Sequence, residues 1–284
     1  MGIKGYYLGC PGWGLKNWVG RLFPQGTRSE QYLTRYAEVF NTVEGNTTFY
    51  ALPTADTVAR WRDQTPDTFR FCFKFPREVS HDKLLVDASE DALRFIERVA
   101  PLEQRLGTLF VQLPPRFGPE HLGRLRAFLL ALPKGFQYGV ELRHEQFFAG
   151  GPVEDDAVAL LRELAVDLVI MDARGLHAGH SLAVADVRAR KPNLPVVMRA
   201  TAQRPLVRCV PHESFDAGRH FVEPWAPMLA TWIQAGKQPY FFMHSPDDTD
   251  APANAYAFHA MLRAHADVGD LPAWPGTPRQ LGLF

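Results

Sequence analysis

Short apolar runs rich in β-branched and aromatic residues alternate along the chain with longer segments of helical periodicity. Each run is followed by a loop and then by a stretch whose apolar residues recur every three or four positions. This alternation is typical of βα units, in which successive strands lie parallel and the helices cover them. The runs that we predict as strands are Tyr6–Gly9, Thr42–Asn46, Arg70–Lys74, Thr108–Gln112, Gln137–Glu141, Asp167–Met171, Leu206–Cys209 and Tyr240–His244.

The helices between these strands are marked by start signals and by apolar stripes. Thr27 with Glu30 forms a capping-box pattern, and Gly118-Pro119 places proline where the first turn of a helix tolerates it. Two later helices are predicted from Pro224 and over residues 253–265. The stripes that we expect to be buried are Leu33, Tyr36, Ala37 and Phe40; Leu122, Leu125, Phe128, Leu129 and Leu132; Trp225, Met228, Leu229, Trp232 and Ile233; and Phe258, Met261 and Leu262.

The unit count predicts an α/β fold with a single (β/α)₈ TIM-type barrel. Successive units are spaced by roughly 28 to 38 residues, and such barrels usually take about 250 residues. The G-x-G-x-x-G turn of a doubly wound dinucleotide-binding sheet is absent. The weakest pattern lies at residues 174–205, where Val196–Met198 is an alternative seventh strand or an additional strand beside Leu206–Cys209.

We expect the barrel to cover residues 1–268 and a short, extended, Pro-rich C-terminal tail to cover residues 269–284. The composition of the chain changes beyond Gly269, where proline recurs every third residue at Pro272, Pro275 and Pro278. No internal repeat or interdomain linker is visible in the sequence. The chain therefore reads as one domain with a tail.

Composition and charge narrow the function classes. A chain of 284 residues with 46% hydrophobic and 22% charged residues is neither disordered nor fibrous. Lys+Arg and Asp+Glu both number 31, so only a local patch could attract nucleic acid or another anion. The three cysteines are far apart, which argues against a disulfide framework. The chain lacks a signal-peptide pattern and an apolar run of about 18 residues, so we expect a cytoplasmic protein with no membrane partner.

In a barrel, chemistry belongs at the carboxyl ends of the strands. Glu44 and Glu141 lie within apolar runs, where an unpaired carboxylate is costly. Basic partners are available at other strand ends, and nearby aromatic residues would form either core or the apolar wall of a pocket. A purely structural charge network is the alternative interpretation. The residues that we expect at the mouth are Trp13, Glu44, Asn46, Tyr50, Lys74, His81, Gln112, Glu141, Arg143, Asp172 and Arg208.

The same residues, in the same order, resemble the domain of unknown function 72 family, the YecE-like barrels. This resemblance implies a TIM-type barrel and supplies no reaction. At strand seven, similar proteins carry an Arg-x-His-Gly run, whereas here Arg208 is followed by Cys209-Val210-Pro211. The matching segments are Gly9–Trp13, Trp18, Phe23-Pro24, Phe40–Tyr50, Trp61, Thr65-Pro66, Phe71–Lys74, His81, Phe110–Pro115 and Val140–His144.

Three kinds of site remain open. A phosphate site would combine a helix N-terminus at Pro252 and Asn254 with charge from Arg208, Arg143 and Lys74, and would take a phosphorylated or nucleotide-like ligand. A hydrolytic or lyase site would need environments that separate the pKa values of Glu44 and Glu141. A divalent metal such as Mn²⁺ or Mg²⁺ would suit Glu44, Glu141, Asp172 and a histidine, although the sequence requires no metal or other cofactor.

The tail carries a further motif. Gln280-Leu281-Gly282-Leu283-Phe284 resembles the pentapeptide that binds the bacterial DNA sliding clamp. Leu281, Leu283 and Phe284 would supply apolar anchors and Gln280 hydrogen bonds in a partner's groove. The alternative is that the tail folds back onto the helices of its own barrel.

These observations lead to two functional hypotheses. The first is an enzyme acting on a phosphate-bearing or nucleic-acid-derived ligand. In it, Glu44 or Glu141 acts as general base, and Lys74 and Arg143 stabilise negative charge. The second is a non-catalytic binding module that its tail connects to DNA replication or repair. The sequence does not decide between them.

Overall fold

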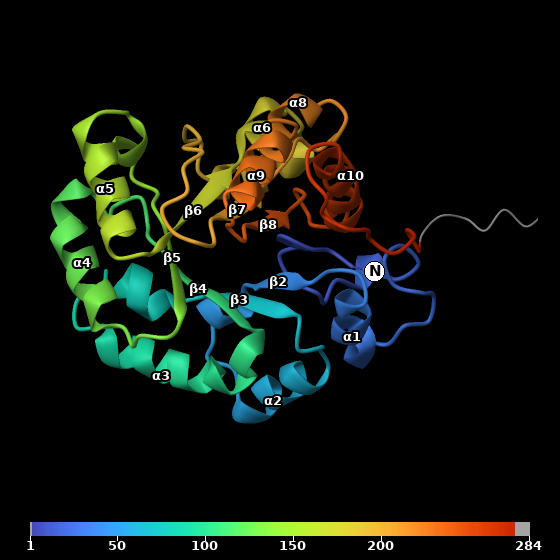
Figure 1. Ribbon diagram of the computed structural model, residues 1–284, viewed down its shortest axis with the longest axis horizontal. Coiled ribbons are helices and arrows are strands. Elements are labelled where there is room, and N and C mark those ends of the chain that lie inside the picture. The colour runs from blue at the N-terminus through green and yellow to red at the C-terminus, as the bar shows by residue number, and fades with distance from the viewer. Residues whose placement is uncertain (1, 276–284) are drawn as a thin grey trace, which may run out of the picture.

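The parallel strands form the centre of the molecule in the computed structural model, which describes residues 2–275 (Figure 1). They belong to one eight-stranded sheet in the order β1-β8-β7-β6-β5-β4-β3-β2, and every paired neighbour is parallel. All eight predicted strands are confirmed; residues 196–198 are irregular, so the alternative seventh strand is wrong. The strands are β1 (Tyr7–Gly9), β2 (Thr42–Gly45), β3 (Arg70–Lys74), β4 (Leu106–Gln112), β5 (Gln137–Glu141), β6 (Asp167–Asp172), β7 (Leu206–Cys209) and β8 (Tyr240–Met243).

The barrel is nearly closed where β1 meets β2. The Glu44 N–H donates to the Cys10 carbonyl at 3.1 Å, just beyond the end of β1. Gly9 permits this approach, because a Cβ at that position would lie 2.1 Å from the Thr42 carbonyl oxygen. The predicted (β/α)₈ TIM-type barrel is therefore confirmed.

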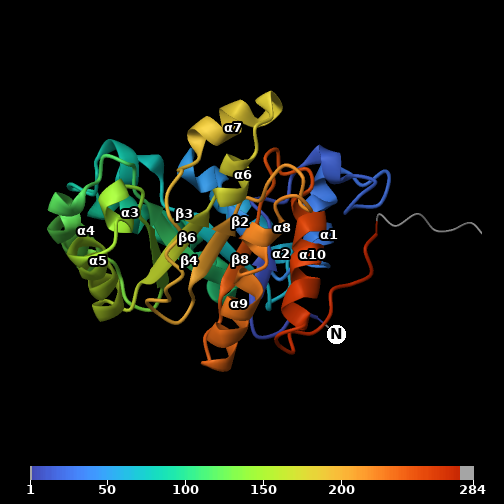
Figure 2. The same cartoon turned by 90° about the horizontal axis from the view of Figure 1, so that it is seen from above.

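Helices surround the barrel (Figure 1). Figure 2 shows α7 apart from the other helices, at one end of the molecule. Both α6 and α7 belong to the long connection between β6 and β7, where the sequence pattern was weakest. The helices are α1 (Tyr32–Ala37), α2 (Ala55–Asp63), α3 (Ser89–Val99), α4 (Leu122–Ala131), α5 (Pro152–Glu163), α6 (Arg174–Ala178), α7 (Ala185–Arg190), α8 (Arg219–Val222), α9 (Trp225–Gln234) and α10 (Ala251–Arg263).

Most predicted helix starts agree with the structure. Pro119 opens a short 3₁₀ turn before α4, and Pro224 directly precedes α9. The capping box at Thr27 is wrong, because the Thr27 hydroxyl donates to the Pro24 carbonyl instead. The reach-back bond is made one residue later, from the Arg28 N–H to the Gln31 side chain at 3.2 Å. Ala37, Leu122, Met228, Ile233 and Met261 are only partly buried, and the other predicted stripe residues are buried.

Apolar side chains form two separate layers. The larger one lies between the strands and the surrounding helices. The smaller one fills the inside of the barrel, and it consists of Cys72, Phe110, Val169, Leu206, Tyr240 and Phe242, with Tyr7 packed against it.

A polar layer follows the inner apolar layer toward the carboxyl ends of the strands. Strand residues two positions apart point to the same face of a sheet. Lys74, Gln112, Arg208 and His244 each follow a residue of the inner apolar cluster by two positions. The fold therefore gathers charged side chains inside the barrel, at its C-terminal mouth.

The described start of the tail, residues 269–275, lies against α10. The Nε2 atom of His259 is 3.2 Å from the Gly269 carbonyl oxygen, and the Trp274 ring packs edge-on against Tyr256 at 4.9 Å. The predicted clamp-binding residues, Gln280, Leu281, Leu283 and Phe284, lie outside the described residues. Across residues 2–275, no helix has the length and apolar character needed to cross a membrane.

Candidate functional site

Arg208 of β7 joins the two predicted glutamates inside the barrel. Its Nε and Nη2 atoms donate to the two oxygens of Glu44 at 2.8 and 2.7 Å. Its Nη1 atom donates to Glu141 Oε2 at 2.5 Å, and Arg143 Nε donates to the other Glu141 oxygen at 2.6 Å. We call these four side chains the glutamate–arginine network. Strands far apart in the sequence thus meet through one guanidinium group.

Lys74 and His244 border this network on the Glu44 side. Lys74 Nζ lies 3.7 Å from Glu44 Oε1, and His244 Nε2 lies 3.3 Å from Glu44 Oε2. His244 Nδ1 is 3.7 Å from Asp248 Oδ1, on the loop after β8. Burial lowers the pKa of His244, although Glu44 opposes the shift, so the imidazole is neutral at physiological pH.

Both glutamates are fully buried and ionised. Burial alone would raise the pKa of each, but the neighbouring cations outweigh it. The charges of Arg208 and Lys74, together with the hydrogen bond between Glu44 and His244, hold the pKa of Glu44 well below its usual value. Arg143, Arg208 and Lys74 lower the pKa of Glu141 to about 2. The two carboxyl groups therefore do not form an acid–base pair with separated pKa values, and the hydrolytic or lyase hypothesis in that form is wrong.

Two lysines near the network have lowered pKa values, which favour the neutral form, in contrast to the ionised glutamates. Burial, with the nearby charge of Arg208, lowers the pKa of Lys74 to about 7. The same two causes lower the pKa of Lys191 to about 8. Both amines therefore change charge close to neutral pH, which is unusual for lysine.

A cavity of about 430 Å³ opens above the network, and we call it the mouth cavity. It combines cationic side chains with a few aromatic and amide groups, as ligand pockets often do. Its wall is formed by Pro11, Asn46, Phe49, Tyr50, Lys74, Gln112, Arg143, Val187, Arg190, Lys191, Arg208, His244, Pro246 and Asp248.

Positive charge predominates on this wall. Five of its residues are lysine or arginine, and its carboxylate is Asp248. Glu44 and Glu141 lie beneath the wall and are held by Arg208. Among residues 2–275, Lys191 Nζ has neither a hydrogen-bond partner nor an ion-pair partner. The cavity therefore presents an excess of cationic groups to whatever enters it.

Most of the predicted site residues come together here. Asn46, Tyr50, Lys74, Gln112, Arg143 and Arg208 line the mouth cavity, with Glu44 and Glu141 beneath it. The Asn46 Oδ1 atom is buried and has no hydrogen-bond partner in the described part of the chain.

Asp172 does not belong to the mouth, and this prediction is wrong. It follows Val169 of the inner layer by three positions, so its side chain points to the opposite face of the sheet. Its carboxylate accepts from Trp225 Nε1 of α9 at 2.7 Å and from Arg174 Nη2 at 2.8 Å. Asp172 therefore connects β6 to the start of α6 and to the start of α9, outside the barrel.

Trp13 and His81 also lie outside the described wall of the mouth cavity. The Trp13 ring packs edge-on against Trp61 and Phe71, at centroid distances of 5.5 and 6.0 Å, and so belongs to the core. His81 Nδ1 is 2.9 Å from the Ser80 hydroxyl, and its ring contacts the edge of Phe49. Burial and nearby arginines lower the pKa of His81 to about 4. The ligand-binding role predicted for these two side chains is therefore corrected.

The N-terminus of α10 does not face the mouth cavity. Pro252 does occupy the first turn, as predicted, but it lines a different cavity of about 210 Å³ beside Trp18. At that turn the Asp250 carboxylate is already paired with Arg21 at 2.7 Å. Asn254 is buried in α10 and is absent from the wall of the mouth cavity. The predicted phosphate position at Asn254 is therefore wrong.

The proposed metal set does not assemble. Arg208 lies between Glu44 and Glu141, and Asp172 points out of the barrel. In the described range, no three His, Cys, Asp or Glu side chains come together as metal ligands. The donor atoms of the predicted carboxylate–imidazole set therefore do not fit a divalent ion.

Sequence reasoning missed Arg190 and Lys191. They end α7 and belong to the connection between β6 and β7, which crosses the mouth instead of continuing the strand pattern. A helix-ending basic pair before Pro192 was visible in the sequence, but nothing there indicated that it would fold over the barrel.

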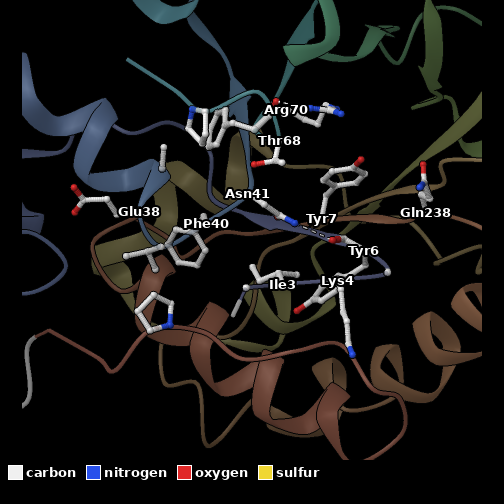
Figure 3. A pocket seen from close by; sticks show the side chains of 17 residues that line it. Ile3, Lys4, Tyr6, Tyr7, Glu38, Phe40, Asn41, Thr68, Arg70 and Gln238 are labelled. Carbon is white, nitrogen blue, oxygen red and sulfur yellow. Dashed lines mark hydrogen bonds between the residues drawn. The ribbon is translucent and has the colours of Figure 1, made fainter. Parts of the chain in front are cut away.

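A larger cavity, of about 580 Å³, lies at the opposite end of the barrel (Figure 3). Its charged groups already have partners. Lys4 is paired with Asp267 at 2.6 Å, and Arg70 donates to two backbone carbonyls. Both ends of the Asn41 amide bond to the β1 segment, to Leu8 and Tyr6. This cavity offers little that would hold a charged ligand.

Comparison with known proteins agrees with the fold and extends over almost the whole chain. The family model described as "Protein of unknown function DUF72" matches residues 7–279. The UPF0759 protein YecE of Escherichia coli K12 is 42% identical over 280 residues, which cover 98% of this chain and 99% of that protein.

Two solved DUF72 structures share the fold. One from Thermotoga maritima has a TM-score of 0.66 at 22% identity and covers 91% of this chain and 99% of its own. One from Enterococcus faecalis has a TM-score of 0.69 at 20% identity and covers 91% of this chain and 97% of its own. At these identities the likeness shows the fold alone. By its sequence and its barrel, the chain belongs to the DUF72 family.

Proposed function

We propose that the protein is an enzyme acting on a small phosphate-bearing ligand bound in the mouth cavity. The observation that carries this proposal is the Lys191 ammonium, which faces the cavity without an ion-pair partner in residues 2–275. An ammonium withdrawn from water and left unpaired is costly. A bound anion would remove that cost.

Arg143 and Arg190 support the same ligand chemistry. Arg143 is bonded to Glu141 through Nε, and Arg190 Nε is bonded to the Asp186 carbonyl at 3.0 Å. Their Nη groups form no hydrogen bond with the described residues. A guanidinium group matches the geometry of phosphate, which makes these residues natural partners for it. Arg208 and Arg143 together balance the two negative charges of Glu44 and Glu141. Lys74, Arg190 and Lys191 then supply the excess positive charge on the cavity wall.

Lys74 is the residue best suited to transfer a proton. A catalytic base works best when its pKa is near the working pH, and that of Lys74 is about 7. Glu141, with a pKa of about 2, is a much weaker base, so the general-base role predicted for the glutamates passes to Lys74. Glu44, at 3.7 Å, would stabilise the ammonium formed when Lys74 takes up a proton. The glutamate–arginine network then positions Lys74 and is not itself the base.

The test is a screen for turnover of phosphorylated metabolites by the purified full chain. We expect Lys74→Met to lower the rate about 10²–10⁴-fold, the usual size of a lost acid–base contribution. With Lys74 as base, turnover should rise as the pH increases through about 7, because the neutral amine is the active form. Lys4→Met, at the other end of the barrel, is the matched control. Absence of turnover for every phosphorylated compound, or an unchanged rate in Lys74→Met, would contradict the proposal.

The second function, docking to a bacterial DNA sliding clamp, is supported by the sequence of the tail. Gln280, Leu281, Leu283 and Phe284 match the binding pattern, and they follow a Pro-rich segment of the sequence. A pull-down of the clamp by the full chain, compared with a chain lacking residues 280–284, tests it. Equal recovery of the clamp would rule the motif out.

A further inference from the structure

Tyr50 is an exposed aromatic residue on the wall of the mouth cavity. Its side chain is 82% exposed, and it is the one aromatic ring among the exposed large hydrophobic residues of the described chain. The Phe49 ring supports it edge-on, at a centroid distance of 5.2 Å. An exposed aromatic ring beside a polar cavity is a common feature of sites that bind planar ligands.

Tyr50 also separates the mouth cavity from a second cavity of about 260 Å³, since both are lined by Phe49 and Tyr50. The second cavity has Leu52, Pro76 and Phe95 on its wall. A ligand held by its phosphate in the mouth could therefore extend over the Tyr50 ring toward a partly apolar surface.

The charges of the second cavity differ from those of the mouth. Its two arginines are already paired, Arg77 with Asp82 at 3.2 Å and Arg94 with Asp91 at 2.8 Å. Glu78 adds a further carboxylate to its wall. This cavity would not attract a second phosphate, so the part of the ligand that reaches it is uncharged.

We propose that the ligand is a nucleoside phosphate, whose phosphate lies in the mouth cavity and whose base stacks on Tyr50. This inference rests on the proposed function, because it takes the cationic mouth as the phosphate site. The sugar of a nucleotide would bring hydroxyl groups to the Asn46 and Gln112 amides, which lie on the same wall. Every nucleobase offers a flat π-face, so stacking alone tolerates any of the four bases.

The experiment compares ligands that differ only in the base. Dissociation constants of the full chain are measured by calorimetry for the four common nucleoside 5′-monophosphates and for ribose 5-phosphate. We expect at least one nucleotide to bind about 10-fold more tightly than ribose 5-phosphate, the size of one stacked base. Tyr50→Ala should remove this preference, whereas Tyr50→Phe should keep it. Leu130→Ala, at an exposed residue of α4, is the control.

The possible results separate the two proposals. If ribose 5-phosphate binds and no nucleotide binds more tightly, the phosphate site stands and the nucleoside assignment is wrong. The assignment is also wrong if Tyr50→Ala keeps the preference for the base. If neither ribose 5-phosphate nor any nucleotide binds, the nucleoside assignment is wrong, and the turnover screen of phosphorylated compounds decides the proposed function separately.

Discussion

The cavities at the two ends of the barrel differ in their cationic side chains and in the partners that these side chains have. The bottom cavity is larger, at about 580 Å³ against about 430 Å³ for the mouth cavity. Lys4 and Arg70 at the bottom are bonded to a carboxylate and to backbone carbonyls (Figure 3). At the mouth, Lys191 has no partner in the described chain. The gathering of five lysine and arginine side chains around one cavity, and not volume, therefore distinguishes the candidate site.

The largest expected effect comes from breaking the network at the mouth. Arg208→Met would remove both hydrogen bonds that Glu44 receives from arginine and would leave Glu141 with Arg143 alone, so we expect the free energy of unfolding to fall by about 3–5 kcal/mol. Arg70→Met, at the bottom, removes hydrogen bonds to carbonyls and should cost about 1 kcal/mol. Urea unfolding of both variants measures the difference.

A further variant shows whether unpaired charge is the cause of this loss. Adding Glu44→Gln and Glu141→Gln to Arg208→Met removes the buried charges, so most of the lost stability should return. Equal losses in Arg208→Met and Arg70→Met would contradict the contrast between the two ends.

The sequence was sufficient to predict the fold and the centre of the mouth. Glu44 and Glu141 were visible because charged residues rarely stand inside apolar runs without a partner. Arg208 was predicted for the same site as one of their partners. Asp172 was predicted at the mouth but lies outside the barrel. A shift of one position along a strand moves a side chain from one face of the sheet to the other, and the sequence did not show which face Asp172 would take.

The rest of the site could not be predicted because it depends on tertiary placement. Arg190 and Lys191 come from a connection without regular periodicity, and only packing over the mouth brings them to the cavity. The helix N-terminus at Pro252 was predicted correctly as local structure, but the cavity that it faces is a different one. Local patterns thus indicate elements better than they indicate which cavity a side chain reaches.

The second prediction concerns Asp167, the buried carboxylate that begins β6 away from the mouth. Burial raises its pKa to about 7, and its Oδ2 atom has no hydrogen-bond partner among residues 2–275. A raised carboxyl pKa favours the folded state at low pH, and this contribution is lost as the pH rises from about 4 through about 7. Asp167→Asn keeps an acceptor for the Arg204 N–H.

We therefore expect Asp167→Asn to stabilise the protein by about 2 kcal/mol at pH 8 and to have little effect at pH 4. Thermal unfolding at the two pH values measures this. A stabilisation equal at both pH values would show that ionisation of Asp167 is not the cause.

The most direct test of the account is a sulfate titration across pH, since sulfate keeps its charge throughout. Lys74 and Lys191, with pKa values of about 7 and 8, lose their charge as the pH rises. We expect sulfate affinity to fall about 10-fold between pH 6.5 and 9, equivalent to a shift of about one pKa unit on binding. Lys191→Gln should weaken binding about 10-fold at pH 6.5 and flatten the curve, and Lys4→Gln should change neither. Equal weakening by both variants, or affinity independent of pH, would contradict the assignment of the anion site to the mouth.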